Sequence, residues 1–195
     1  MTMRVAVAVS GRGSNLQALL DTLGNNATAQ VALVLSNRAS AQALERAADR
    51  GIPTAVLKDA ADGAEWIRLL EAASIDLVVL AGYLKLVPQA VVQRFPGQVI
   101  NIHPALLPSF GGPGMYGARV HAAVLASGVP ETGATVHLVD EVYDRGQILG
   151  QVRVPVRADD TAHSLAERVL EAEHRLLPAA VLAAAKAGRP VPFSV

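Results

Sequence analysis

Short apolar runs alternate with helix-like segments along the first half of the chain, and this alternation constrains the fold more than any other feature. The runs are rich in Val, Leu and Ala and largely lack polar positions, which is typical of strands buried on both faces. They occupy residues 4–10, 31–35, 54–57, 76–81 and 99–102. Helices are predicted between them, at residues 15–23, 41–50, 65–73 and 88–95. The sequence therefore predicts an α/β fold, an open and mostly parallel twisted sheet with helices on both faces.

Two of these helices carry a local start signal. Ser40 is expected to cap the helix over residues 41–50, which stops at Gly51. Pro88 is expected at the first helical position of residues 88–95, because a missing N–H group costs nothing there.

The pattern changes after residue 130. Residues 135–139 and 147–156 are strand-like with no helix between them, which predicts an antiparallel strand pair near the C-terminal part. Residues 161–187 predict one long helix, with Pro178 expected to bend it. No linker and no internal repeat interrupts the chain, so we expect a single domain over residues 1–195.

Composition excludes several classes of function. The formal net charge is +0, so no overall attraction to nucleic acid or to an acidic membrane is expected. The absence of Cys excludes disulfides and thiolate chemistry, and no His-x-x-x-His spacing indicates a metal site. No apolar run is long enough to cross a bilayer, and the start is too short for a signal peptide. We therefore expect a cytoplasmic protein with no metal, nucleic-acid or membrane partner.

The stretch SGRGSNLQ, residues 10–17, follows the first predicted strand. Two glycines open a tight turn, and Ser14 and Asn15 stand where a helix N-cap belongs. Free backbone N–H groups and the positive end of a helix dipole attract phosphate at such a place. A capped turn without a ligand is the alternative. The third glycine of G-x-G-x-x-G is missing, which favours a single phosphate over a dinucleotide.

Asn101 and His103 lie at the carboxyl end of the strand over residues 99–102. Two residues apart on a strand, they share a face, and ligands of open parallel sheets bind beyond the carboxyl ends. An Asn amide can stabilise an oxyanion, and His can move a proton near neutral pH. Pro104 and Pro108 stiffen the segment that follows. The alternative is a hydrogen-bonded strand-end histidine next to a turn asparagine.

The stretch DEVYDRG, residues 140–146, is an acidic loop between the last two predicted strands. It offers Asp140, Glu141 and Asp144. A carboxylate close to His103 would orient the imidazole and raise its pKa by favouring the charged ring. The alternative is a solvated hairpin loop, because the residues alone do not bring the loop and His103 together.

Five motifs, in order over nearly the whole chain, resemble the folate-dependent formyltransferase family. They are SGRGSNLQ, LAGYLKLVP, NIHPALLPSF, TGATVHLVDEVYDRGQILGQ and ERVLEAEHRLLP. Within that family, SGRGSN and the compact length resemble the glycinamide ribonucleotide formyltransferases. The resemblance implies transfer of the formyl group of 10-formyltetrahydrofolate, as co-substrate, to the amine of glycinamide ribonucleotide in de novo purine biosynthesis. It implies no metal and no covalent enzyme intermediate.

The resemblance also implies roles for individual residues. Asn101, His103 and Asp144 match the catalytic trio. The phosphate-binding loop is matched by Gly13, Ser14 and Asn15, and a late substrate-binding position by Glu173. Folate binding is implied for Leu84, Lys85, Leu86, Val87, Asn101, Asp140, Glu141, Val142, Tyr143 and Asp144. The Leu107–Pro108 bond stands where the family has a cis-proline.

Several residues to which the resemblance gives no role have a structural or an open interpretation. The glycine-rich residues 110–121 form either a lid, from which His121 could reach the site, or a surface turn. A structural role is expected for His137, which lies within a predicted strand. Polar-face positions on the last helix are expected for His163 and His174, and packing roles for Trp66 and Tyr83.

Other functions remain to be weighed against the transferase. A formyltetrahydrofolate deformylase would use the same trio with water as nucleophile, but such relatives carry an N-terminal regulatory domain and this chain begins on its first strand. A methionyl-tRNA formyltransferase would need a basic RNA-binding extension. A non-catalytic nucleotide-binding module would not need the three polar residues together. Small-molecule substrates are expected as partners, and either a monomer or a homodimer.

Overall fold

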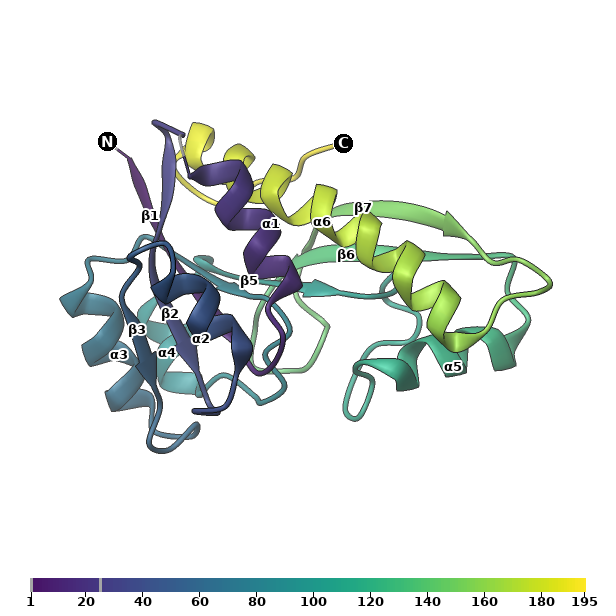
Figure 1. The fold of residues 1–195 in the computed structure, drawn as a ribbon, viewed down its shortest axis with the longest axis horizontal. Helices are drawn as coiled ribbons and strands as arrows, with labels where there is room; N and C mark the ends of the chain where they lie inside the picture. Colours follow the sequence, from purple (N-terminus) through teal and green to yellow (C-terminus); the bar gives the residue numbers. More distant parts are fainter. Residues whose placement is uncertain (1, 25) are drawn as a thin grey trace.

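Seven strands form one sheet in the order β3-β2-β1-β4-β5-β6-β7 (Figure 1). The computed structural model describes residues 2–24 and 26–195. The strands are β1 (Met3–Val9), β2 (Ala29–Ser36), β3 (Thr54–Val56), β4 (Leu77–Leu80), β5 (Val99–His103), β6 (Glu131–Leu138) and β7 (Ile148–Pro155). The helices are α1 (Ser14–Leu23), α2 (Gln42–Ala48), α3 (Gly63–Ala72), α4 (Gln89–Arg94), α5 (Ala118–Ser127) and α6 (Ala162–Ala187).

The sheet is parallel from β3 to β5 and antiparallel beyond β5, which confirms the predicted fold class. β1 pairs with β2 on one side and with β4 on the other, both in parallel. The strand order therefore reverses at β1, and ligands of open α/β sheets bind beyond the carboxyl ends at such a point. β6 runs antiparallel to both β5 and β7, as the sequence predicted for the C-terminal strand pair.

Each face of the sheet has its own hydrophobic core. In β1, Val5 and Val7 face the core that contains α1 and α6, whereas Ala6 and Ala8 face the core that contains α3 and α4. Side chains alternate between the faces of a strand, so one apolar strand serves both cores. Burial on both faces explains why the parallel strands are almost continuously apolar in sequence.

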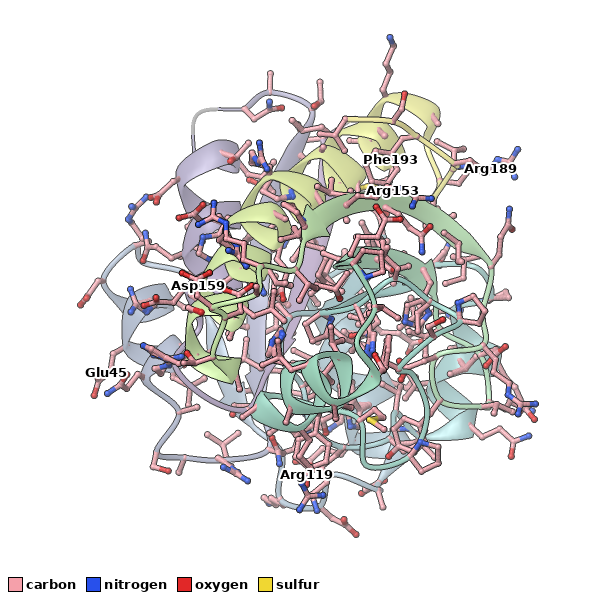
Figure 2. The ribbon with its side chains drawn as sticks, turned by 90° about the vertical axis from the view of Figure 1, so that its right-hand side faces the viewer. Glu45, Arg119, Arg153, Asp159, Arg189 and Phe193 are labelled. Atoms are coloured by element: carbon pink, nitrogen blue, oxygen red, sulfur yellow. The ribbon has the colours of Figure 1, made fainter. Side chains whose placement is uncertain are left out.

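The chain end packs back on the outer strand of the sheet. The Phe193 N–H donates to the Leu149 carbonyl of β7 at 2.9 Å. A side chain on Gly150 would collide with the Phe193 ring, which therefore lies directly over that strand. In Figure 2, Phe193 lies among the packed side chains, whereas Arg189 and Glu45 point outward.

The helix α5 was not predicted. The sequence placed residues 110–121 in one lid or surface turn, but α5 begins at Ala118 and buries Val120, His121 and Val124. Left-handed or positive-φ glycines stand at both ends, Gly117 and Gly128. The glycine-rich stretch before the helix hid its start, because glycine lowers helix propensity over any window that includes it.

Three expected helix starts lie elsewhere. The N-cap of α2 is Ala41 and not Ser40, and the Ala43 N–H in its first turn donates to the Gly11 carbonyl at 3.1 Å. A neighbouring loop thus supplies an acceptor, and no side-chain cap is used. Gly13 is the N-cap of α1, so Ser14 is its first residue, and Pro88 is the N-cap of α4.

Other local predictions can be compared directly. The Leu107–Pro108 peptide bond is cis, as expected. The last helix starts with a capping box between Thr161 and Ser164 and continues through Pro178, whose effect on helix direction stays a prediction. Within residues 2–24 and 26–195, no helix combines the length and apolarity needed to cross a membrane.

Candidate active site

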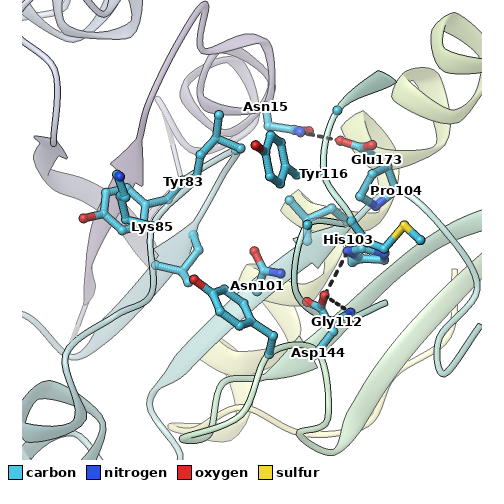
Figure 3. A pocket seen from close by; sticks show the side chains of 18 of the residues that line it. Asn15, Tyr83, Lys85, Asn101, His103, Pro104, Gly112, Tyr116, Asp144 and Glu173 are labelled. Carbon is cyan, nitrogen blue, oxygen red and sulfur yellow. Dashed lines mark hydrogen bonds and ion pairs between the residues drawn. The ribbon is translucent and has the colours of Figure 1, made fainter. Parts of the chain in front are cut away.

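A cavity of about 800 Å³ lies beyond the carboxyl ends of β1, β4 and β5 (Figure 3). Segments far apart in sequence form its walls: the loop after β1, the loop after β4, the end of β5, the loop before α5, the loop after β6 and one side of α6. The predicted site residues that line it are Asn15, Leu84, Lys85, Leu86, Val87, Asn101, His103, Asp140, Val142, Tyr143, Asp144 and Glu173.

The structure brings Asn101, His103 and Asp144 together. Asn101 and His103 lie on one face of β5, and the loop after β6 carries Asp144 back to them. The His103 Nδ1 atom lies 3.6 Å from the Asp144 Oδ2 atom, and both side chains are at least nine-tenths buried. The interpretation of residues 140–146 as a solvated hairpin is therefore wrong at Asp144.

The two ring nitrogens of His103 have different neighbours. Nε2 lies 2.8 Å from the Phe110 carbonyl, which only accepts, so Nε2 carries the proton. Nδ1 then has a free lone pair on the side of Asp144. Burial lowers the pKa of His103 below its ordinary value, although the Asp144 charge and the Phe110 bond oppose that effect. The expected effect of the carboxylate on the pKa is therefore present, but the net shift is downward, because the sequence indicates the carboxylate and not the burial.

Asp144 keeps its charge despite burial. Burial alone would raise its pKa, but His137, His103 and the Gly112 N–H together hold the pKa below its ordinary value. The Gly112 N–H donates to Oδ2 at 2.9 Å. A left-handed backbone at Asp144, with φ of 56°, turns the carboxylate inward from the loop. The result is a fixed anion between two histidines.

His137 belongs to the site, which the sequence did not indicate. It stands directly opposite Asn101 in the β5–β6 register, and its Nε2 lies 3.1 Å from the Asn101 Nδ2. The same Nε2 lies 3.4 Å from the Asp144 Oδ1. Its Nδ1 donates to the Leu138 carbonyl at 2.8 Å. His137 therefore fixes the Asn101 amide, whose second N–H stays available to a ligand.

His121 lines the cavity from α5, as expected of a residue able to reach the site. The side chain is buried, and its Nδ1 has no hydrogen-bond partner. Burial lowers its pKa, and the nearby His103 lowers it further. A second neutral imidazole thus faces the same cavity.

Asn15 and Glu173 form a buried pair at one end of the cavity (Figure 3). The Asn15 Nδ2 donates to the Glu173 Oε2 at 2.5 Å, which ties α1 to α6. Burial raises the pKa of Glu173 to about 7, although the Asn15 hydrogen bond acts in the other direction. The Asn15 Oδ1 has no partner. This end of the cavity therefore offers polar atoms to a ligand.

The glycine loop before α1 rests on α2. Gly13 has φ of 77°, and a Cβ there would lie 2.5 Å from the Ala43 Cβ, so only glycine fits. The Nε of Arg46, on α2, donates to the Arg12 carbonyl at 2.8 Å. Of this loop, Arg12 and Asn15 line the cavity, whereas Gly13 and Ser14 contribute the N-terminus of α1 next to it.

The opposite wall is apolar. Leu84 and Leu86 from the loop after β4, and Val142 and Tyr143 from the loop after β6, are 40–50% exposed although they are large hydrophobic residues. The loop after β4 is held by Ser10, whose hydroxyl accepts from the Leu84 N–H at 2.9 Å. An exposed apolar wall of this kind fits a flat aromatic ligand.

Glu141 does not line the cavity. Its Oε1 accepts from Gln89 Nε2 at 2.7 Å and from Gln93 Nε2 at 3.3 Å, so the carboxylate points toward α4. A folate contact of Glu141 stays a prediction, and the structure gives this carboxylate other partners. Asp140 instead caps its own turn, accepting from the Val142 N–H at 2.8 Å.

The expected positions of two aromatic residues and two histidines can be compared with the structure. Trp66 and Tyr83 pack edge to face, with ring centroids 5.4 Å apart, which confirms their packing roles. Tyr83 also lines the cavity. His163 is exposed on α6 beside Glu167, as expected. His174 differs, because its Nε2 is buried without a partner.

Residues 3–181 match the model of the formyl transferase family. The chain belongs to this family. It is 37% identical over 182 residues to phosphoribosylglycinamide formyltransferase of Haemophilus influenzae, which covers 90% of this chain and 84% of that protein. A crystal structure of phosphoribosylglycinamide formyltransferase from Anaplasma phagocytophilum superimposes with a TM-score of 0.90 at 39% identity, covering 96% of this chain and 88% of the other.

Two longer relatives match this chain over only part of their own length. The match to the chloroplastic phosphoribosylglycinamide formyltransferase of Arabidopsis thaliana is 44% identical over 181 residues, 89% of this chain and 62% of that protein. The match to the human trifunctional purine biosynthetic protein adenosine-3 is 46% identical, 91% of this chain and 18% of that protein. The chain thus spans less than two thirds of the length of either relative.

Proposed function

We propose that this chain transfers the formyl group of 10-formyltetrahydrofolate to the amine of glycinamide ribonucleotide, a step of de novo purine biosynthesis. The supporting observation is the trio of Asn101, His103 and Asp144 between two chemically different ends of one cavity, with His103 and Asp144 at least nine-tenths buried. We infer a cytoplasmic enzyme that works as a single domain over residues 1–195. A monomer or a homodimer stays the expectation.

The two ends of the cavity suit the two substrates. Polar groups at the end formed by Asn15 and Glu173 suit a phosphoribosyl group, and the apolar wall of residues 84–87 and 142–143 suits a pteridine ring. Asn101 lies between these ends in Figure 3. The proposal thus places the amine and the formyl carbon next to the trio, where holding two reactants together lowers the barrier.

Bond formation places negative charge on the formyl oxygen. The amine attacks the formyl carbon, a carbon–nitrogen bond forms, and the carbonyl oxygen becomes an oxyanion. The free N–H of Asn101 is held by His137 and can donate to this oxygen. One positioned donor of this kind contributes roughly 10²–10³ in rate.

His103 carries the proton between the two nitrogens. The amine must lose a proton, and His103 takes it at Nδ1 through a water molecule, since Nε2 donates to Phe110. The new imidazolium faces Asp144, whose charge stabilises it. The proton then passes to the folate nitrogen as its bond to the formyl carbon breaks. Such transfer contributes roughly 10²–10⁴ in rate.

One assay separates the transferase from its alternatives. Release of tetrahydrofolate from the 10-formyl donor is followed by absorbance, with and without glycinamide ribonucleotide. We expect release only when the ribonucleotide is present. Release without it would make water the nucleophile and favour a deformylase, and no release in either case would favour a non-catalytic nucleotide-binding module.

A further inference from the structure

The Arg12 guanidinium is an unpaired charge at the rim of the cavity. Arg12 is exposed in the loop before α1 and lines the cavity beside Asn15. Within residues 2–24 and 26–195, no carboxylate lies within ion-pair distance of it. The backbone of Arg12 does have a partner, because the Arg46 side chain donates to the Arg12 carbonyl. The backbone at Arg12 is therefore anchored, and its side-chain charge is not neutralised.

The atoms around Arg12 suit an anion. The first turn of α1 contains no acidic residue, and its N-cap Gly13 offers no side-chain cap, so the helix N–H groups stay available. Asn15, 7% exposed, has an Oδ1 atom with no partner, which points independently to a ligand with hydroxyl groups. Glu173, which lines the same end of the cavity, is already bound to Asn15.

We propose that Arg12 binds the phosphate of the ribonucleotide and makes the enzyme selective for phosphorylated substrates over the free nucleoside. This inference rests on the function proposed above and adds a residue to the substrate-binding loop. An arginine forms a planar fork that pairs with two phosphate oxygens, whereas backbone N–H groups supply no net charge. The partly neutral state of Glu173, whose pKa burial raises to about 7, reduces repulsion of the phosphate dianion.

Two substrates isolate this contact. Initial rates are measured with glycinamide ribonucleotide and with glycinamide riboside, which lacks the phosphate, for the wild type and Arg12→Met. We expect Arg12→Met to lower kcat/KM for the ribonucleotide roughly tenfold to a hundredfold, mainly through KM, as loss of a charge-assisted hydrogen bond predicts. The value for the riboside should not change. Equal losses with both substrates, or no loss with either, would overturn the proposal.

Two further variants control for charge and geometry. Arg12→Lys keeps the charge but not the fork, so it should recover part of the lost kcat/KM. Arg38→Met removes an exposed arginine that follows β2 and does not line the cavity, and it should leave both substrates unaffected. A loss in Arg38→Met equal to that in Arg12→Met would reduce the effect to net charge and overturn the proposal.

A binding measurement tests the role of Arg12 even if the proposed reaction does not occur. If the wild type turns over neither substrate, the proposed reaction fails, and calorimetry with ribose 5-phosphate and ribose then tests Arg12 alone. Arg12 binding predicts that ribose 5-phosphate binds the wild type tighter than ribose and that Arg12→Met removes this difference. An unchanged preference in Arg12→Met would overturn the role of Arg12.

Discussion

His103 can take up a proton at only one of its nitrogens, because Nε2 already donates to Phe110. Replacing it by Ala removes the proton carrier but leaves Asn15, Glu173 and the apolar wall in place. We expect His103→Ala to lower kcat by roughly 10²–10⁴ with little change in the KM for the ribonucleotide. Steady-state kinetics test this, and turnover at the wild-type rate would refute the role of His103.

Asp144 sets the pH range in which His103 works. Its charge raises the pKa of His103 against the larger lowering effect of burial. Without that charge the pKa falls further, so in Asp144→Asn the acidic limb of kcat/KM should move to lower pH. The plateau should also fall, because the imidazolium loses its partner, by roughly 10² or more. A pH profile of kcat/KM checks both effects, and an acidic limb moved to higher pH would contradict them.

The role of a single residue could be predicted where it follows from spacing within a motif. It could not be predicted where it depends on tertiary packing. Asn101 and His103 share a face because they are two apart on a strand, which the sequence shows directly. His137 was expected to be only structural, because the register between β5 and β6 cannot be read from the sequence. That register puts His137 opposite Asn101. The sequence indicated that a carboxylate raises the pKa of His103, but it did not show the burial that makes the net shift downward.

At the scale of elements, the contact of the α1 loop with α2 depends on Gly13. Gly13→Ala puts a Cβ 2.5 Å from the Ala43 Cβ at a φ of 77°. We expect a loss of roughly 1–3 kcal/mol in the free energy of unfolding and weaker substrate binding, because the loop must shift. Gly11→Ala is the matched control, since nothing lies within 4 Å of its added Cβ. Thermal unfolding compares them, and equal stabilities would contradict the packing argument.

The Asn15–Glu173 pair makes the α1–α6 contact depend on pH. Burial raises the pKa of Glu173 from 4.5 to about 7, so the folded state keeps a proton that the unfolded state loses. This carboxyl therefore stabilises the fold less as pH rises from 4.5 to 7, and the loss is complete above that range. Glu173→Gln removes the effect and should gain stability relative to the wild type over this range, on the order of 3 kcal/mol.

Urea unfolding at pH 4.5, 6 and 8 measures this difference between Glu173→Gln and the wild type. The exposed Glu171→Gln on the same helix serves as matched control. A difference that shrinks as pH rises would contradict a raised pKa at Glu173.

Elements could be predicted where apolar periodicity is unbroken. The strands and most helices follow from it, whereas α5 did not, since Gly111, Gly112, Gly114 and Gly117 precede it within a few residues. Helix starts were predicted less well than helix positions. Ser40 is a favourable cap by type, but the Gly11 carbonyl already accepts from the first turn of α2. Such tertiary partners are absent from any local pattern.

At the scale of the whole molecule, the strand order explains why distant motifs meet. The chain reverses direction across the sheet at β1, which leaves the carboxyl ends of β1, β4 and β5 bordering one cavity. The antiparallel β6 ends beside the amino end of β5, where Leu138 pairs with Ile100, so the loop after β6 must fold back toward the cavity to bring Asp144 to His103. Alternation of elements predicted the sheet, but the order of the strands came only from the structure.

The shared sheet also predicts how the molecule unfolds. Leu70 on α3 and Leu176 on α6 are fully buried in the cores on opposite faces, and β1 contributes side chains to both. Neither core can persist once the strands between them separate. We expect Leu70→Ala and Leu176→Ala each to cost about 2–5 kcal/mol and each to shift one common transition. Their effects should add in the double variant, because the side chains share no contacts across the sheet.

Calorimetry tests whether the two cores unfold together, because a single cooperative unit has equal calorimetric and van't Hoff enthalpies. Leu70→Ala should lower the temperature of the whole transition, including the loss of the near-ultraviolet signal from Trp66 on its own face and of ligand binding at the α6 side. If Leu70→Ala splits the transition and leaves the α1–α6 side folded at higher temperature, the two faces are separate cooperative units. Asn101 and His103 on β5 would then lie in a sheet that can lose the helices of one face and keep those of the other.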